Sequence, residues 1–283
     1  MVLATAVSVV CLWLALRGLA LDRVGYALAG AQYALLIPAL GLYFAGVGIR
    51  SMRWHYLLLG LKDVSSARLF PVVVIGYMAN DVLPARLGEL ARCFVLRRRE
   101  GVPSSAALGS VLLERVMDGL TMLAFMAITL LLLPFSSALF QLMAIAGAGF
   151  GVATAGLAVL VARPRLADRL LTAVTEPLPA TAGGRLRQTA TSFLGGLGVL
   201  GGLWPVLRVF TLSCAAWGLE AGMYYVLMFA FPLTPSFPLA ALTTAVANLG
   251  TLIPSSPGYV GVFDFIGRSV LAQFGVPAEA ALA

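Results

Sequence analysis

The sequence predicts an all-α polytopic membrane protein, a helical bundle with two re-entrant (broken-helix) hairpins whose shared pattern indicates an inverted repeat. Of the 283 residues, 60% are hydrophobic and 11% are charged, and the mean hydropathy is +0.97. Soluble domains carry about 25% charged residues, so a soluble fold is excluded. Several apolar runs approach or exceed the ~20 residues that cross a bilayer. Proline and glycine interrupt some of the shorter runs.

We expect one integral membrane domain over residues 1–283, because no polar segment is long enough to form a second domain. The first apolar run lacks a basic leader and a small-residue cleavage site, so it is interpreted as a membrane segment and not as a signal peptide. The apolar runs cover residues 1–16, 26–49, 69–83, 105–133, 138–161, 206–231, 239–253 and 259–275.

Arginines between the runs predict the orientation, because basic residues favour the cytoplasmic side. Basic residues occur within 50–68 and at 97–99, on both sides of the segment 69–96. Since both ends of that segment are then cytoplasmic, it is predicted to dip into the membrane and return. By the same alternation, residues 239–275 dip in from the opposite side. Residues 163–193 mix arginines with apolar residues and are predicted to form a cytoplasmic amphipathic loop on the membrane surface.

The two predicted dips share an order of residues: Ala-Asn, a short apolar run, proline, glycine and an acid. The first dip supplies this order through Ala79, Asn80, Pro84, Gly88 and Glu89. The second dip supplies it through Ala247, Asn248, Pro254, Pro257, Gly258, Gly261 and Asp264. Paired broken segments of opposite orientation are typical of transporters with a midplane site. The match covers few residues, so coincidence remains the alternative.

Three ionisable residues stand inside the apolar run 105–133, in the stretch "SVLLERVMDGL". Glu114 and Asp118 are four residues apart and share a helix face, and Arg115 lies about 100° around the helix from Glu114. Each charge at the bilayer centre costs roughly 2.5–3.5 kcal/mol on insertion scales. These side chains are therefore predicted to face the protein interior and to meet opposite charges.

The first dip offers partners for these charges: Arg86 and Arg92 as cations, and Glu89 as an anion for Arg115. One interpretation is a structural network that fixes the dip against the helix. The other is a binding site for a charged lipid headgroup, because arginine suits bidentate contact with phosphate. The two interpretations are compatible.

Other charged residues are weaker candidates. Glu220, within "WGLEAGMYY", is predicted to pair with Arg208 or Arg268 across the bundle, with a lone coupling group as the alternative. Asp264 and Arg268 have the spacing of an ordinary i,i+4 helical ion pair.

The sequence gives no support for catalysis. The chain has one histidine, His55, three scattered cysteines and no nucleotide-binding fingerprint. We therefore expect no enzyme activity, no cofactor and no metal site. The net charge of +7 fits anionic lipid headgroups better than nucleic acid, and no nucleic-acid partner is expected.

The stretch "NDVLPARLGELARCFVLRRREGVPSSAALGSVLLERVMDGL" and the later "IPSSPGYVGVFD" resemble the transmembrane domain of lysylphosphatidylglycerol synthases, a flippase-like family that also occurs as stand-alone chains. The first motif is matched by Asn80, Pro84, Arg86, Gly88, Glu89, Arg92, Glu114, Arg115 and Asp118. The second is matched by Pro254, Pro257, Gly258, Gly261 and Asp264. In the family, glutamate is common at the position of Asp264 and glycine at that of Tyr259, and further apolar sequence is expected beyond Ala283.

The resemblance implies a helical membrane fold with two re-entrant hairpins that moves a lipid between leaflets, here without the soluble synthase domain. The implied substrate is an anionic or phosphate-bearing lipid, either a phospholipid or a polyprenyl-phosphate-linked lipid. The alternatives are a lipid-binding membrane enzyme or accessory subunit of envelope biosynthesis, and a purely structural assembly protein. We expect an integral protein of a prokaryotic cytoplasmic membrane; the sequence leaves a homo-oligomer open. The expected substrate-binding residues are Asn80, Arg86, Glu89, Arg92, Glu114, Arg115, Asp118, Pro254, Pro257, Gly258 and Asp264.

Overall fold

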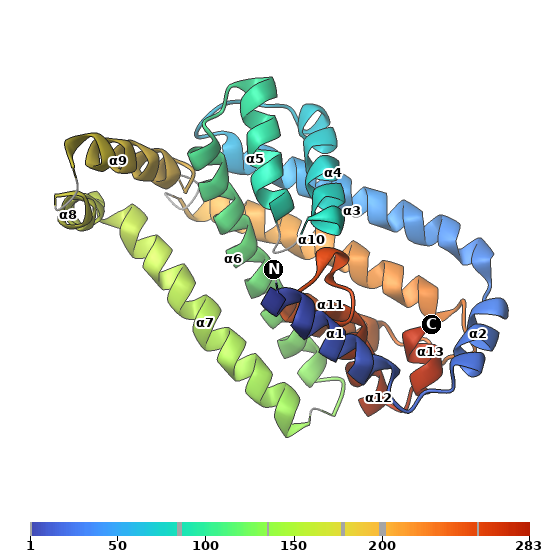
Figure 1. The fold of residues 1–283 in the computed structure, drawn as a ribbon. Coiled ribbons are helices and arrows are strands. Elements are labelled where there is room, and N and C mark those ends of the chain that lie inside the picture. Colours follow the sequence, from blue (N-terminus) through green and yellow to red (C-terminus); the bar gives the residue numbers. More distant parts are fainter. Residues whose placement is uncertain (1, 84–86, 135, 177–178, 198–201, 254) are drawn as a thin grey trace.

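The computed structural model describes residues 2–83, 87–134, 136–176, 179–197, 202–253 and 255–283 (Figure 1). These residues form α-helices and two short 3-10 helices joined by turns, with no strand among them. The predicted all-α fold class is therefore confirmed.

The four longest helices are α3 (Leu36–Leu58), α6 (Ser104–Leu130), α7 (Ser137–Ala162) and α10 (Leu203–Met228). At 1.5 Å per residue they are about 35–40 Å long, which exceeds the ~30 Å hydrocarbon core of a bilayer. Helices α3 and α10 pack along each other across the back of the molecule (Figure 1). The charged residues described below lie against these two helices.

When apolar composition is required as well as length, fewer than four of the described helices qualify as candidate membrane spans. Two pass this test, Tyr33–Leu58 and Ser137–Leu160, and a bent pair would make a third. The pair joins α1 (Val2–Leu16) to α2 (Leu21–Ala29) at a bend of 81°. Helix α6 is long enough to span, but it carries the ionisable stretch around Glu114.

Both predicted dips are broken into shorter helices. The first consists of α4 (Ser66–Val82) and α5 (Leu87–Glu100), which pack against each other as a hairpin (Figure 1). Leu83 ends α4 in an extended conformation, as expected for a residue that precedes proline. The second dip contains α11 (Phe237–Gly250), the 3-10 turn η3 (Pro257–Tyr259) and α12 (Val262–Gln273).

Helices α8 (Pro164–Thr175) and α9 (Ala180–Gly195) lie at one end of the molecule, and α2 and α13 (Ala278–Leu282) lie at the other (Figure 1). Helix α7 leads into α8 and α9, which occupy most of the predicted amphipathic loop. Helix α9 packs on α6, and the short α13 packs on α12 and α2. Helix α1 lies against α12 (Figure 1).

The predicted run 26–49 is placed incorrectly. Its first residues belong to α2, and the spanning helix α3 continues past residue 49 to Leu58. Arg50 and Arg53, which the sequence assigned to a cytoplasmic connection, are therefore inside the helix, with 5% and 0% of their surface exposed. The helix continues because carboxylates on α6 and α10 neutralise both guanidinium groups.

Two groups of buried apolar side chains support the charged centre. The first is built around Trp54 and Leu57 of α3, with partners on α4, α5 and α6. The second joins Met122 and Met126 of α6 to Trp217 of α10 and to α11. On α6 the first group extends to Met117 and the second begins at Met122, so Asp118 lies where the two groups meet.

Candidate functional site

Glu114 of α6 is the centre of a buried ionic network. Its carboxylate oxygen Oε1 lies 3.2 Å from Arg53 Nη2, 3.0 Å from Arg92 Nη2 and 2.7 Å from Arg115 Nη2. Only 1% of the Glu114 side chain is exposed. One carboxylate thus holds guanidinium groups from α3, α5 and α6, which confirms that the charges of α6 face the interior and meet opposite charges.

Asp118, one turn further along α6, binds two of these arginines, Arg53 and Arg115. Its Oδ1 accepts hydrogen bonds from Arg53 Nη1 at 2.5 Å and from the indole Nε1 of Trp217 at 2.7 Å. Its Oδ2 lies 3.4 Å from Arg115 Nη2. Arg53 also donates to the hydroxyl of Ser213 at 2.7 Å. Asp118 therefore connects α6 to α3 and α10.

Trp54 orients Arg92, which belongs to α5 of the first hairpin. The guanidinium of Arg92 stacks over the Trp54 ring at 4.9 Å from its centroid, and only 3% of Arg92 is exposed. The indole nitrogen of Trp54 donates to Ser110 Oγ at 3.1 Å. Stacking and ion pairing together fix the position of the Arg92 side chain.

Two further ion pairs extend the network. Arg115 Nε lies 3.4 Å from Glu89 of α5, as the sequence predicted. Arg50 of α3 pairs with Glu220 of α10 at 2.5 Å and stacks over Trp217 at 4.5 Å from the ring centroid. The predicted partners of Glu220, Arg208 and Arg268, are therefore wrong, because the assignment of Arg50 to a loop removed it from consideration.

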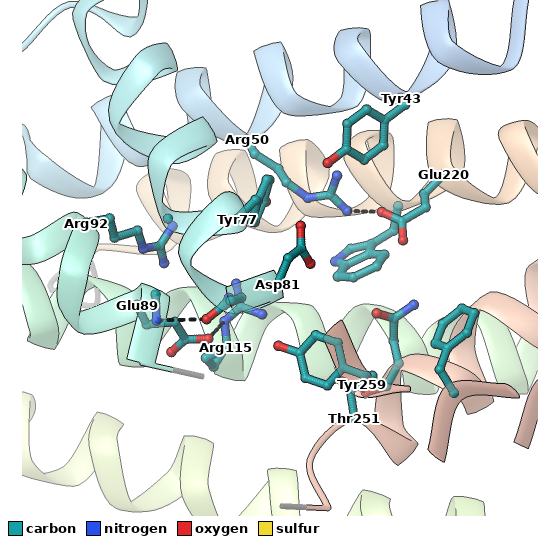
Figure 2. Close-up of a pocket in the computed structure, with 16 residues that line it drawn as sticks. Tyr43, Arg50, Tyr77, Asp81, Glu89, Arg92, Arg115, Glu220, Thr251 and Tyr259 are labelled. Atoms are coloured by element: carbon teal, nitrogen blue, oxygen red, sulfur yellow. Dashed lines mark hydrogen bonds and ion pairs between the residues drawn. The ribbon is translucent and has the colours of Figure 1, made fainter. Parts of the chain in front are cut away.

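A cavity of about 230 Å³ lies beside this network (Figure 2). The charged side chains that line it are Arg50, Asp81, Glu89, Arg92, Arg115 and Glu220. Its other lining residues are Tyr43, Gly76, Tyr77, Asn80, Gly88, Trp217, Asn248, Thr251, Tyr259 and Phe263. Helices α3, α4, α5, α6, α10, α11 and α12 and the turn η3 all contribute to its wall.

The asparagines of the two Ala-Asn pairs line the same cavity: Asn80 is in the last turn of α4 and Asn248 is in the last turn of α11. Asn80 accepts a hydrogen bond from the backbone N–H of Gly88 at 2.9 Å, which ties α4 to α5. The helices approach so closely that a Cβ on Gly88 would lie 2.1 Å from the carbonyl oxygen of Gly76. Gly88 is therefore required for this contact.

The structure brings most of the sequence-predicted residues together. Asn80, Glu89, Arg92 and Arg115 line the cavity, while Glu114 and Asp118 lie behind the arginines. Three of the residues named from the sequence are outside the described residues: Pro84, Arg86 and Pro254.

The turn η3 contains two members of the second motif, Pro257 and Gly258. A Cβ on Gly258 would lie 3.9 Å from the carbonyl oxygen of Asp81, so this turn abuts the end of α4. Gly258 has φ of 68°, a conformation that glycine adopts at little cost. The turn closes one side of the cavity through the next residue, Tyr259.

Asp264 and Arg268 do not form the helical ion pair that their spacing predicted. Asp264 caps α12, because its carboxylate accepts from the backbone N–H of Gly261 at 2.9 Å. Arg268 donates to the backbone carbonyls of Leu14 and Ala15 at 3.1 and 2.5 Å. Both side chains line a second, more apolar cavity of about 250 Å³ and not the one beside Glu114.

Sequence reasoning missed Arg50, Arg53, Trp54 and Trp217. The available signal was that Arg50 and Arg53 share a helix face at i,i+3 and that apolar residues resume at Trp54. Among the described residues, no group of three or more His, Cys, Asp or Glu side chains is arranged to hold a metal ion.

Known proteins resemble this chain over most of its length or over part of it. A UPF0104 membrane protein of Methanothermobacter thermautotrophicus is 23% identical over 273 residues, which are 90% of this chain and 78% of that protein. The glycosyltransferase AglD of Haloferax volcanii is 30% identical over 105 residues, which are 36% of this chain and 17% of AglD. No solved structure is matched by this chain.

The family model described as the lysylphosphatidylglycerol synthase TM region matches residues 1–283. This match agrees with the motifs found around Asn80 and Glu114, and with the helices of bilayer length. The chain is an integral membrane protein and belongs to the lysylphosphatidylglycerol synthase TM-region family.

Proposed function

We propose that this protein is a flippase-like transporter that moves a phosphate-bearing lipid between the leaflets of a prokaryotic cytoplasmic membrane. The observation that carries the proposal is the cavity lined by Arg92 and Arg115, on a bundle whose long helices match the thickness of a bilayer. Ionisable side chains at membrane depth mark substrate pathways in transporters. The lipid tails would stay in the bilayer while the headgroup enters the cavity.

The arginines are the proposed contacts for phosphate. Arg115 is 25% exposed on its side chain and faces the cavity, and Glu89, Glu114 and Asp118 fix its position. Arg92 lines the same cavity and is fixed by Glu114 and Trp54. A pre-organised guanidinium group contacts phosphate with little further loss of conformational entropy.

The hairpins α4–α5 and α11–α12 are the proposed re-entrant elements. Each is too short to form two full spans, and the last turn of its first helix carries an asparagine that lines the cavity, Asn80 or Asn248. In transporters with inverted repeats, broken helices from the two halves meet at a site near the midplane. We propose that the two hairpins enter from opposite leaflets and leave the headgroup site between them.

A second candidate function is lipid binding in support of glycosyl transfer. The similarity to the glycosyltransferase AglD over 36% of this chain favours it. In that case a polyprenyl-phosphate lipid would be held in the cavity for modification and not released into the other leaflet. Our proposal is that the chain transports lipid and catalyses no reaction of its own.

The test is transbilayer movement of fluorescent phospholipids and of a polyprenyl-phosphate lipid in liposomes that contain the purified chain. Wild type should move at least one of these lipids at least tenfold faster than protein-free liposomes. Arg115→Gln should remove most of this acceleration while still eluting as a folded protein. The matched control is Arg68→Gln, whose side chain is 73% exposed and remote from the cavity, and it should behave as wild type.

Two results would reject the proposal. One is movement no faster than in protein-free liposomes for every lipid tested. The other is an Arg115→Gln variant that is folded and as fast as wild type. Mass spectrometry of lipids that co-purify with the chain, together with a search for glycosylated products after addition of sugar donors, separates transport from the second candidate.

A further inference from the structure

We propose that Asp81 and the aromatic side chains around it form a subsite for an ammonium group on the lipid headgroup. The proposal rests on the proposed function, because it names the chemistry of a headgroup that the cavity would take. Asp81 stands on the last turn of α4, and its side chain extends into the middle of the cavity (Figure 2).

Asp81 takes no part in the ion pairs that the described residues form at the cavity. Among the described residues, the ion pairs at the cavity join Arg50, Arg53, Arg92 and Arg115 to Glu89, Glu114, Asp118 and Glu220. Asp81 has no ion pair within 4.0 Å in the part of the chain that the structure describes. Asp81 is exposed at the cavity, and its negative charge favours a cationic group there.

Aromatic side chains provide a second reason for a cation. Five of them line the cavity: Tyr43, Tyr77, Trp217, Tyr259 and Phe263. The face of an aromatic ring attracts an ammonium group within ~6 Å, and several rings together recognise quaternary ammonium ligands. One such contact already exists inside the protein, since the Arg50 guanidinium lies 4.5 Å from the centroid of the Trp217 ring.

Tyr259 is held in the cavity in an unfavourable backbone conformation. It is the one non-glycine residue with positive φ among the described residues, at 59°. Strained residues of this kind persist where the surrounding structure holds them, and they gather at ligand sites. The turn η3, which contains Tyr259, is held in place at its start: the backbone N–H of Ser256 donates to Ser8 Oγ of α1 at 2.7 Å. We infer that the ring of Tyr259 is kept at the cavity for contact with the headgroup.

The size of the cavity agrees with a headgroup. Its volume of about 230 Å³ is below the roughly 300–1,000 Å³ of sites for drug-sized ligands. A phosphate with a short amine fits such a space, and acyl chains do not. Arg115 and Asp81, which both line the cavity, would then contact the phosphate and the ammonium of one zwitterionic headgroup.

The test measures binding and not transport. The purified chain in detergent is titrated with three dihexanoyl phospholipids that differ only in headgroup, namely ethanolamine, choline and glycerol. The Kd for ethanolamine and choline should be at least tenfold lower than for glycerol. Asp81→Asn should raise the first two values by about tenfold and leave the third within twofold, and Asp81→Glu should retain the preference. Tyr259→Leu should weaken binding of the choline lipid more than binding of the glycerol lipid.

The matched control is Asp63→Asn, which removes an acid whose side chain is 81% exposed, and it should change no Kd. Equal or tighter binding of the glycerol lipid would overturn the subsite, as would binding of none of the three lipids. This comparison uses wild type and so does not depend on a variant that folds poorly. An Asp81→Asn variant that keeps the preference would overturn it too.

Failure of the subsite and failure of the transport proposal are distinguishable. Transbilayer movement without any preference for ammonium headgroups in the binding assay rejects the subsite and keeps the transporter. A clear binding preference without acceleration of movement in liposomes keeps the subsite and rejects the transporter.

Discussion

Arg53 of α3 and Asp118 of α6 form a 2.5 Å ion pair in the interior of the bundle, although they are 65 residues apart in the chain. The Arg53 side chain is fully buried and the Asp118 side chain is 7% exposed. Burial of two charges costs several kcal/mol per ion, and the cost is offset only when geometry and further hydrogen bonds are good. Arg53 meets this condition through Glu114 and Ser213, and Asp118 meets it through Trp217.

Removal of Arg53 should therefore destabilise the protein strongly. Arg53→Met leaves Glu114 and Asp118 with one cation fewer, and the expected loss is about 3–5 kcal/mol in the free energy of unfolding. The measurement is reversible unfolding in mixed detergent micelles. Arg68→Met, at a surface position, should cost no more than about 1 kcal/mol. Equal losses in the two variants would show that the network contributes nothing to stability.

Trp217 should stabilise Asp118 through its indole nitrogen. Trp217→Phe keeps an aromatic ring beside Arg50 but removes a 2.7 Å hydrogen bond to a buried carboxylate. The expected loss is about 1.5–3 kcal/mol, the range for hydrogen bonds to charged groups. Trp204→Phe is the control, because Trp204 is 78% exposed. A loss at Trp204 as large as that at Trp217 would contradict the assigned role.

Swapping the two charges of the Arg50–Glu220 pair should harm the protein less than replacing one charge alone. Glu220→Arg places two cations together between α3 and α10 and should prevent accumulation of folded protein. The double variant Arg50→Glu with Glu220→Arg restores opposite charges and should recover part of the yield, because coupled residues are not additive. The readout is the monodisperse fraction on gel filtration. A double variant no better than the single one would show that the two side chains do not interact.

Close packing of α9 on α6 depends on glycine. A Cβ on Gly109 would lie 2.2 Å from the carbonyl oxygen of Phe193 in α9. Gly109→Ala should therefore lower the thermal midpoint, with a cost of about 1–3 kcal/mol for overpacking. A Cβ on Gly149 of α7 would meet nothing within 4 Å. Gly149→Ala should be neutral or raise the midpoint, since alanine is the better helix former.

The sequence predicts the charged centre well where ionisable residues interrupt an apolar run. Glu114, Arg115 and Asp118 stand inside such a run, so their burial and their need for opposite charges follow from the cost of a charge in hydrocarbon. Glu89 and Arg92 follow from the neighbouring segment, whose proline and glycine indicate a break. The structure agrees with these pairings.

Other features depend on tertiary contacts that no local pattern contains. Arg50 and Arg53 occur where an apolar run ends, and a run of this kind normally ends in a loop. The carboxylates of Glu114, Asp118 and Glu220, far along the chain, make helical continuation favourable. At Asp264 the sequence predicts an ion pair that does not form. The spacing from Arg268 favours this pair, but the free backbone N–H of Gly261 at the helix start is a nearer partner.

The passage of a headgroup through the cavity is tested most directly by blocking the cavity covalently. In a background with Cys11, Cys93 and Cys214 replaced by alanine, Asn248→Cys places a single thiol at the cavity, and Val152→Cys places one on the exposed face of α7. Modification of Asn248→Cys with a bulky maleimide should reduce transbilayer lipid movement at least tenfold, and modification of Val152→Cys should leave it unchanged. Unimpaired movement after complete labelling at position 248 would contradict the account.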